Sequence, residues 1–447
     1  MAQASLPPGP KSKLHILRYM RNPYAFMEDS VRRYGPIFTL HSPNGSAVIT
    51  TTPEGARDLL SGRGSDFYVG FGTDIIESLV GSGSLLTISG DRHRMERNML
   101  SPTFHGQRMR AYGSDVLEAT LRTTSSWQSG TELTAQECMQ AISIDVILRA
   151  VFGVQGPEEM DAFKQSIRRG IDEVNPLLVF FTFLQKEMGG FGPWARFKRS
   201  QREFHSLILD RIADARRVDS PGEDVLSRLA AARYEDGTPV PDEAIRDHVV
   251  TMLIAGHETT ATTLAWAMAE LALHPEVVSR IRDEVASLGP NPTPDAISSL
   301  EYLDAVGREV LRLHPIIAEF FRTVKTGTFP LQGWNIPADM SIGASILMIQ
   351  RNPELYPEPL EFKPERFLER RFAPHEFAAF GGGHRHCIGS AFAMNEIKIV
   401  LGTIVPRFDW SLQLDHPPKV VRRNVTLAPE KGAPIRIERV VAPARAA

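Results

Sequence analysis

Apolar and polar residues recur along most of this chain with the spacing of an α-helix. The longest such stretch, about residues 242–273, is apolar on nearly every side before Gly256, which is typical of a buried helix. The region from Arg92 to Asp247 is also helical in pattern and is interrupted at glycine and proline residues. These patterns predict a mainly α-helical protein.

Short strands are predicted nearer the two ends of the chain. Residues 37–40 and 47–50 have strand-like sequences around a Pro-Asn-Gly turn, and residues 326–345 and 424–439 carry further strand-like segments. Residues 62–88 are rich in glycine and serine, which predicts a long loop. The expected architecture is one large helical domain with small β-sheets.

Composition argues against several classes of protein. The 447 residues carry a net charge of −3, which argues against nucleic-acid binding as the main function. No stretch approaches the ~20 apolar residues of a membrane span, and the N-terminus lacks the apolar core of a signal peptide. The two cysteines, Cys138 and Cys387, make no disulfide framework and fit a reducing compartment. We therefore expect a cytoplasmic protein without a membrane anchor and, because nothing resembles a linker or a repeat, a single domain over residues 1–447.

The segment with the most chemical content is residues 380–389, Phe-Gly-Gly-Gly-His-Arg-His-Cys-Ile-Gly. An apolar helical pattern follows it, so Cys387 lies at or just before a helix N-terminus, where the helix dipole favours a thiolate. The glycines allow the backbone to approach a flat, bulky group, and a lone thiolate there suits an axial ligand to haem iron. The alternatives are a buried structural cysteine and a zinc site, but His384, His386 and Cys387 are too crowded for tetrahedral zinc.

Residues of this segment match a known signature. Phe380, Gly383, Cys387 and Gly389, with Arg385 at the usual basic position, resemble the haem-binding signature Phe-x-x-Gly-x-x-x-Cys-x-Gly of the cytochrome P450 family. The resemblance covers nearly the whole chain. It implies the cytochrome P450 fold, with haem b between the long central helix and the loop of the cysteine ligand. A β-rich lobe of about residues 1–60 and 320–345 would pack on the helical body.

The central helix carries a polar cluster, Ala255-Gly256-His257-Glu258-Thr259, within an apolar stretch. Gly256 in a helix interior costs ~1 kcal/mol relative to alanine, and buried polar groups need partners. The cluster resembles the Ala/Gly-Gly-x-Asp/Glu-Thr motif of the family. This implies that Ala255 and Gly256 leave room for dioxygen, that Thr259 contacts it, and that Glu258 relays protons. The alternative is a kinked helix in which Thr259 bonds back to its own turn.

Other charged residues match family positions on which haem binding depends. The pair Glu309 and Arg312 resembles the Glu-x-x-Arg motif of the family, which implies a buried structural network with Arg366 behind the haem. Haem also brings two carboxylates into the protein, and these need cationic or hydrogen-bonding partners. The residues that match partner positions are His93, Arg97, Arg322 and Arg385.

The resemblance implies a haem-thiolate monooxygenase that inserts one oxygen atom of O2 into a C–H bond, by hydroxylation or epoxidation. Segments that line the pocket in relatives are strongly apolar here, so we expect a mid-sized lipophilic substrate such as a fatty acid, a terpenoid or a polyketide/macrolide-like natural product of secondary metabolism. Glu319 is an acid among apolar neighbours that either pairs with a substrate amine or hydroxyl or points to solvent. The expected pocket residues are Phe67, Phe71, Leu86, Phe180, Leu253, Ile316, Ile317, Glu319 and Leu427.

The resemblance also implies partners for electron transfer. We expect no fused reductase, so electrons would pass from NAD(P)H through a separate ferredoxin reductase and a ferredoxin to a monomeric bacterial protein. Two alternatives remain open. One is a peroxide-dependent peroxygenase, although such relatives usually replace the acid–threonine pair, and the other is a non-catalytic haem-binding protein.

Overall fold

The computed structural model describes residues 6–12, 14–42, 45–70, 73–104, 108–173, 185, 189, 191–218, 222–423 and 425–441. Within these residues the protein is mainly α-helical with four small sheets, so the predicted fold class is confirmed. None of the helices in this part of the chain has the length and apolar character that crossing a bilayer requires.

The chain folds into two compact units, called unit 1 and unit 2 below. Unit 1 comprises Met1–Phe71, Phe104–Ile142 and Thr259–Ala447, and unit 2 comprises Gly72–Thr103 and Ser143–Glu258. Two helices, α7 and α12, contribute residues to both units. The single domain expected from the sequence stays a prediction.

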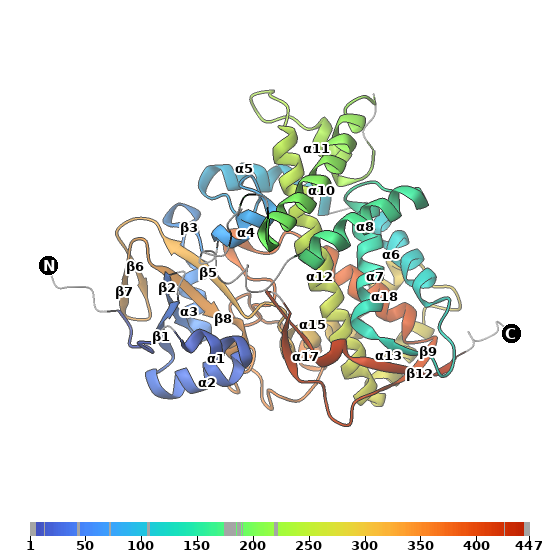
Figure 1. Ribbon diagram of the computed structural model, residues 1–447. Helices are drawn as coiled ribbons and strands as arrows, with labels where there is room; N and C mark the ends of the chain where they lie inside the picture. The colour runs from blue at the N-terminus through green and yellow to red at the C-terminus, as the bar shows by residue number, and fades with distance from the viewer. Residues whose placement is uncertain are drawn as a thin grey trace. The chain divides into compact units, whose positions relative to one another are not determined.

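The largest sheet described in unit 1 joins strands from the start of the chain to strands from its later part, seen in blue and orange in Figure 1. β1 and β2 form the antiparallel pair expected around the turn, and β2 pairs in parallel with β8. β5 pairs antiparallel with both β8 and β3. Both segments of the predicted β-rich lobe thus share one sheet, whereas the packing of that lobe on a helical body stays a prediction. The strands, in sheet order, are β1 (Ile37–Ser42), β2 (Gly45–Thr50), β8 (Ser341–Ser345), β5 (Glu319–Val324) and β3 (Phe67–Val69).

The smaller sheets of unit 1 are one three-stranded sheet and two hairpins, and their strands confirm the strand-like segments predicted near residues 326–345 and 424–439. The three-stranded sheet has β12 in the middle, between β4 and β9. The strands are β4 (Glu132–Thr134), β9 (Phe408–Leu412), β12 (Pro434–Val440), β6 (Thr328–Leu331), β7 (Trp334–Pro337), β10 (Val420–Arg423) and β11 (Thr426–Pro429).

The long loop predicted over residues 62–88 is wrong. This stretch contains the 3-10 turn Gly64–Asp66, the strand β3 and the helix α4 (Thr73–Val80). β3 exists because Phe67 and Val69 lie opposite Val324 and Arg322 of β5, which supply the cross-strand hydrogen bonds. Such pairing between distant segments is invisible to a local reading of glycine and serine content.

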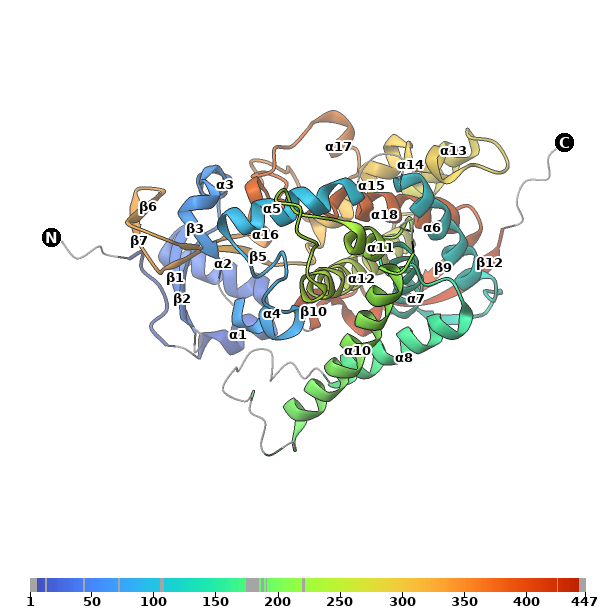
Figure 2. The ribbon, with the colours of Figure 1, turned by 90° about the horizontal axis from the view of Figure 1, so that it is seen from above.

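The region from Arg92 to Asp247, which is predicted to be helical, contains several of the remaining helices. In unit 2, α8 and α10 pack side by side (Figure 2). The helices of unit 2 besides α4 are α5 (Gly90–Leu100), α8 (Pro157–Glu173), α10 (Pro193–Ala215) and α11 (Val225–Ala231). Those of unit 1 are α1 (His15–Arg21), α2 (Pro23–Tyr34), α3 (Pro53–Ser61), α6 (Arg108–Thr124), α13 (Pro275–Ala286), α14 (Pro294–Ser298), α15 (Glu301–Leu313), α16 (Ile346–Ile349), α17 (Arg366–Glu369) and α18 (Ser390–Ile404). The two shared helices are α7 (Ala135–Ala150) and α12 (Asp242–Leu273).

Helix α12 has the bounds that the hydrophobic pattern predicts. Pro241 precedes it, and Asp242 and Glu243 in its first turn interact favourably with the helix dipole. At the other end His274 separates it from Pro275, because a residue before proline disfavours the helical conformation.

A buried ion pair organises unit 1 around α15. Glu309 and Arg312 are completely buried, and the Nε and Nη2 atoms of Arg312 each donate to one carboxylate oxygen of Glu309 at 2.7 Å. The remaining donor capacity of Arg312 goes to the carbonyl oxygens of Gln350, Pro359 and Glu361, at 2.8–3.0 Å. The pair thereby fastens the irregular segment 350–366 to α15. The third expected member, Arg366, lies 3.4 Å from Glu309, so the structure brings together the predicted network.

We predict that Glu309→Gln lowers the free energy of unfolding by ~3–5 kcal/mol, because it leaves the Arg312 charge buried without its counter-charge. The measurement is urea unfolding followed by circular dichroism. Glu118→Gln is the matched control, since Glu118 pairs with Arg122 at the surface of α6 and such pairs contribute ~0.3–0.5 kcal/mol. Equal losses in the two variants would contradict the structural role.

Candidate active site

Cys387 lies in an open loop of unit 1. It falls between the 3-10 turn Gly383–Arg385 and α18, three residues before the first residue of that helix. The residue is exposed, and its backbone N–H donates to the carbonyl of Phe380 at 2.9 Å, which closes the loop. The predicted position of the thiol just before a helix N-terminus is confirmed.

Glycine is required for the shape of this loop. Gly381 and Gly383 have φ angles of 62° and 61°, which other residues rarely adopt. A Cβ atom at Gly383 would also lie 2.7 Å from the carbonyl oxygen of Leu60. At Gly389 a Cβ would meet nothing within 4 Å, so the chain leaves open space beside Cys387.

Two arginines of unit 1 lie close to each other. Arg322 in β5 is buried, and its Nη1 donates to the carbonyl of Phe321 at 2.7 Å. Burial, and next the positive charge of Arg385, lower the pKa of Arg322 to about 10. Two guanidinium groups that repel each other in a partly buried place favour an anion beside them.

These features of unit 1 fit haem. An exposed cysteine near a helix N-terminus suits an axial iron ligand, and the glycine loop permits close approach of a flat ring. The two adjacent guanidinium groups suit the carboxylates of that ring. The donor set therefore matches a thiolate-bound iron porphyrin rather than a small metal ion held by several side chains.

Helix α12 opens at its middle. It is buried along most of its length, but Ile254 is 42% exposed and Ala255 is exposed as well. Glu258 and Thr259 are half-buried and follow these two residues by four positions, which places all four side chains on one helix face. These four residues are called the open face of α12 below.

Two positions near the middle of α12 have surroundings that the sequence alone did not reveal. Leu253, an expected pocket residue, is buried, and the open apolar position is Ile254, which the sequence analysis missed. A Cβ on Gly256 would lie 3.1 Å from the side chain of Ile147 in α7, so this glycine allows α7 to approach. If the burial of α12 had been known, the helical period would have indicated Ile254 as the exposed apolar position.

In unit 2, helix α5 carries His93 and Arg97, which lie four residues apart on one face as predicted. His93 is buried and Arg97 is half-buried. Between them lies Glu96, whose carboxylate is also buried and which the sequence analysis did not single out. An acid on a helix with many charges resembles a solvated residue, so the local sequence contains no signal for its burial.

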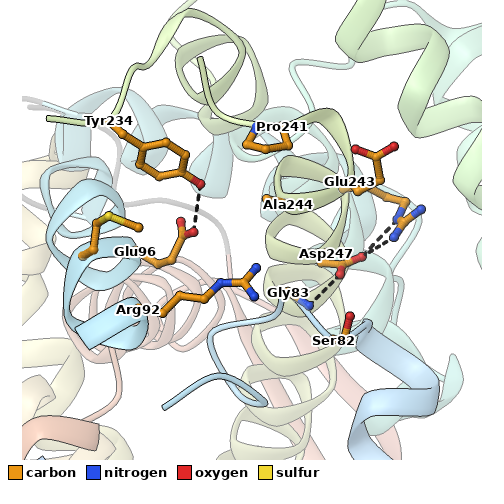
Figure 3. Close-up of a pocket in the computed structure, with 11 residues that line it drawn as sticks. Ser82, Gly83, Arg92, Glu96, Tyr234, Pro241, Glu243, Ala244 and Asp247 are labelled. Carbon is orange, nitrogen blue, oxygen red and sulfur yellow. Dashed lines mark hydrogen bonds and ion pairs between the residues drawn. The ribbon is translucent and has the colours of Figure 1, made fainter. Parts of the chain in front are cut away.

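A polar cavity of about 500 Å³ lies beside Glu96 in unit 2 (Figure 3). Arg92 points into it, and Asp247 on its wall accepts hydrogen bonds from the backbone N–H of Gly83 at 2.9 Å and from Arg246 at 2.7 Å. The wall carries charges of both signs. The lining residues are Ser82, Gly83, Arg92, Met95, Glu96, Tyr234, Pro241, Glu243, Ala244, Arg246 and Asp247.

The expected pocket residues divide into open and buried ones. Leu86 is 41% exposed and Ile317 is 37% exposed, whereas Ile316 is buried, Phe67 belongs to the core of the large sheet, and Leu427 packs with Tyr24, Ala318 and Leu347. Phe71 and Phe180 lie outside the described residues. The assignment of these residues to a substrate pocket stays a prediction.

Glu319 does not point to solvent, so that alternative is wrong. The hydroxyl of Tyr19 in α1 donates to its Oε2, and its Oε1 is buried. Burial raises the pKa of Glu319 to about 7, against smaller lowering effects of Tyr19 and of Arg422 in β10. The guanidinium of Arg422 in turn lies over the ring of Tyr19, 4.8 Å from its centre. These partners come from opposite ends of the chain, so no local pattern could have revealed them.

Comparison with known proteins identifies the family. The family model of cytochrome P450 matches residues 7–436. The chain is 31% identical over 439 residues to cytochrome P450 135B1 of Mycobacterium tuberculosis, covering 97% of this chain and 91% of that one. It is 32% identical over 413 residues to cytochrome P450 138 of the same species, covering 92% and 90%.

Solved structures agree on the fold. A retinoic-acid-bound cyanobacterial CYP120A1 has a TM-score of 0.84 at 24% identity, with 97% of this chain and 99% of that chain covered. The haem domain of cytochrome P450DA has a TM-score of 0.85 at 24% identity, with 98% of both chains covered. The resemblance inferred from the cysteine loop is therefore confirmed, and the chain belongs to the cytochrome P450 family of haem monooxygenases.

Proposed function

We propose that this monooxygenase hydroxylates or epoxidises a mid-sized lipophilic substrate, with Cys387 as the iron ligand and with electrons from a separate ferredoxin. The observation that carries the proposal is the exposed Cys387 in a glycine loop of the unit that also contains the adjacent Arg322 and Arg385. The proposal includes a monomeric, cytoplasmic enzyme whose ferredoxin is reduced from NAD(P)H by a ferredoxin reductase.

Each functional residue would have a separate task. When bound, haem supplies the activation of dioxygen and the transfer of one oxygen atom to a C–H bond. Cys387 holds the iron as a thiolate, and the N-terminal end of α18 favours that ionised state. Phe380, Gly383 and Gly389 shape the loop around the ring, and His93, Arg97, Arg322 and Arg385 hold its carboxylates.

Proton movement is assigned to the open face of α12. The carboxylate of Glu258 takes a proton from solvent, and the hydroxyl of Thr259, the next residue, passes it on toward the oxygen site. Ala255 presents only a methyl group on this face, which leaves room for a small molecule. Because Glu258 and Thr259 are both present, the peroxide-dependent alternative has less support.

The substrate class follows from the exposed apolar side chains. Leu86 and Ile254 in unit 2, and Ile317 in unit 1, each expose apolar surface, which suits a lipophilic substrate. A fatty acid, a terpenoid or a macrolide-like natural product meets this requirement. Glu319 is held by Tyr19, so its first role is in holding α1 and β5 together, with a substrate contact as a second one.

We predict that Cys387→Ser abolishes the long-wavelength absorption band of the reduced carbon-monoxide complex, because a seryl oxygen cannot replace the thiolate. Cys138→Ser is the matched control and should keep the band. Cys138 lies within α7, and burial raises the pKa of its thiol to about 11, which makes it less suited than Cys387 to be the thiolate ligand. Loss of the band in the control alone would overturn the ligand assignment.

We predict that Thr259→Ala and Glu258→Gln each lower product formation by ~100-fold while peroxide release rises, because proton delivery is interrupted. The measurement is product and peroxide formed per NAD(P)H consumed with a surrogate ferredoxin system. Thr260→Ser is the control. Thr260 is buried and follows Glu258 and Thr259 in the chain, and the serine that replaces it keeps a hydroxyl group. Unchanged coupling in both test variants would contradict the assigned tasks.

We predict that stability depends on pH through Glu319. Burial raises the pKa of this acid from its ordinary value of 4.5 to about 7 in the folded protein. At pH values between these two, the folded state therefore binds more protons than the unfolded state. Its contribution to the free energy of unfolding is therefore present near pH 5 and falls as the pH rises through 7, by roughly 1–3 kcal/mol.

The check is urea unfolding of the wild type and of Glu319→Gln at pH 5, 6, 7 and 8. The glutamine cannot titrate, so the difference between the two proteins should change in its favour with rising pH. Glu54→Gln, at the start of α3, is the control for an ordinary helix acid. A difference that is flat across this range would show that Glu319 has an ordinary pKa.

A further inference from the structure

Helix α5 has few apolar residues with which to hold its place. Its buried side chains are His93, Glu96 and Leu100, which are spaced three and four residues apart and so share one face. Of these, only Leu100 is apolar, and the N-cap residue Ser89 makes no side-chain cap bond. The packing of an apolar face, which stabilises most helices in proteins, is therefore minimal in α5.

Glu96 compensates for this lack. Its residue is 1% exposed, and a buried carboxylate is costly unless it is paired. The hydroxyl of Tyr234 donates to its Oε1 at 2.9 Å, and Nε2 of His248 donates to its Oε2 at 3.0 Å. Burial by itself would raise the pKa of Glu96, but the interactions with His248 and Tyr234 outweigh it and hold the pKa below its usual range. Glu96 is therefore ionised at neutral pH.

The partners of Glu96 come from two other segments of unit 2. His248 lies on α12, and Tyr234 lies between α11 and α12, from where its hydroxyl points toward Glu96 (Figure 3). Side chains along a helix are rotated by about 100° per residue, because a turn contains 3.6 residues. Two fixed bonds to Glu96 thus set the rotation of α5 about its own axis, and with it the directions of His93 and Arg97.

We propose that Glu96, through His248 and Tyr234, is a positioning residue that holds α5 in the rotation at which His93 and Arg97 bind the haem carboxylates. This inference rests on the proposed function, because haem is the ligand of the two positioned residues. Partners that orient the residues around a bound metal group commonly change its affinity by ~10–100-fold. Glu96 itself is given no contact with haem or substrate.

The test compares haem loss from the purified holoprotein to excess apomyoglobin. Glu96→Gln keeps the size of the side chain and removes its charge, and we expect about tenfold faster haem loss with an altered circular dichroism spectrum of the haem. Tyr234→Phe removes one of the two bonds and should show a smaller change. Asp91→Asn is the matched control on the same helix, because Asp91 pairs with Arg94 at the surface, and it should leave both readouts unchanged.

A rescue and a stability control separate positioning from a general loss of stability. The double variant Glu96→His with His248→Glu restores a carboxylate–imidazole contact in the same place and should slow haem loss toward the wild-type rate. Ile212→Ala removes a buried side chain of α10 in the same unit and lowers the free energy of unfolding by another route. The proposal is overturned if Glu96→Gln leaves haem loss unchanged, or if Ile212→Ala at equal stability loses haem equally fast.

Amide hydrogen exchange of α5 gives a readout that does not need haem. Glu96→Gln should increase exchange over Gly90–Leu100 relative to Asp91→Asn, and equal exchange would contradict the proposal. Protein that purified without haem would overturn the proposed function, while this exchange measurement would still decide the role of Glu96. The two failures are thus distinguishable.

Discussion

The buried ion pair of Glu309 and Arg312 is the interaction on which the surroundings of Cys387 depend. It fastens the irregular segment before the cysteine loop to α15 through the carbonyl groups that Arg312 contacts. The helix after the loop, α18, packs on the same α15, where a Cβ at Gly307 would lie 3.1 Å from the side chain of Met394. Both ends of the segment that carries the thiol are therefore anchored to one helix. The proposed function makes Cys387 an iron ligand, which must be held in place, and this arrangement supplies that support.

The same physical rule recurs elsewhere, because a buried charge must find its partner inside the protein. In unit 1, Glu270 lies 2.6 Å from His314, whose ring stacks on Trp266 with 3.8 Å between ring centres. Tyr19 and Glu319 join the N-terminal helix to β5, and in unit 2 Glu96 joins α5 to α12. In each case a polar contact connects elements that apolar packing alone would leave loosely oriented. Such contacts are specific in direction, which hydrophobic contacts are not.

The open face of α12 is the part of this architecture to which the proposed function assigns proton transfer. Most of that helix is buried, so the exposed Ile254 and Ala255 and the half-buried Glu258 and Thr259 form a limited open region. The proposed function assigns a lipophilic substrate to the apolar surface there, and proton transfer to the acid next to a hydroxyl. Membership of the cytochrome P450 family gives these residues their chemical context.

Local sequence patterns determined the helical class, the bounds of α12 and the placement of Cys387 before α18, because hydrophobic period and glycine content act over a few residues. The signature around Cys387 and the Glu-x-x-Arg pair also identified the family correctly. The tertiary structure alone decided that β3 pairs with β5, that Ile254 rather than Leu253 is open, and that Glu96 and Glu319 are buried with Tyr234, His248 and Tyr19. Each of these depends on contacts between segments far apart in the chain. A single residue has the same local pattern whether or not a distant partner covers it, so burial of polar groups is settled only when the chain is folded.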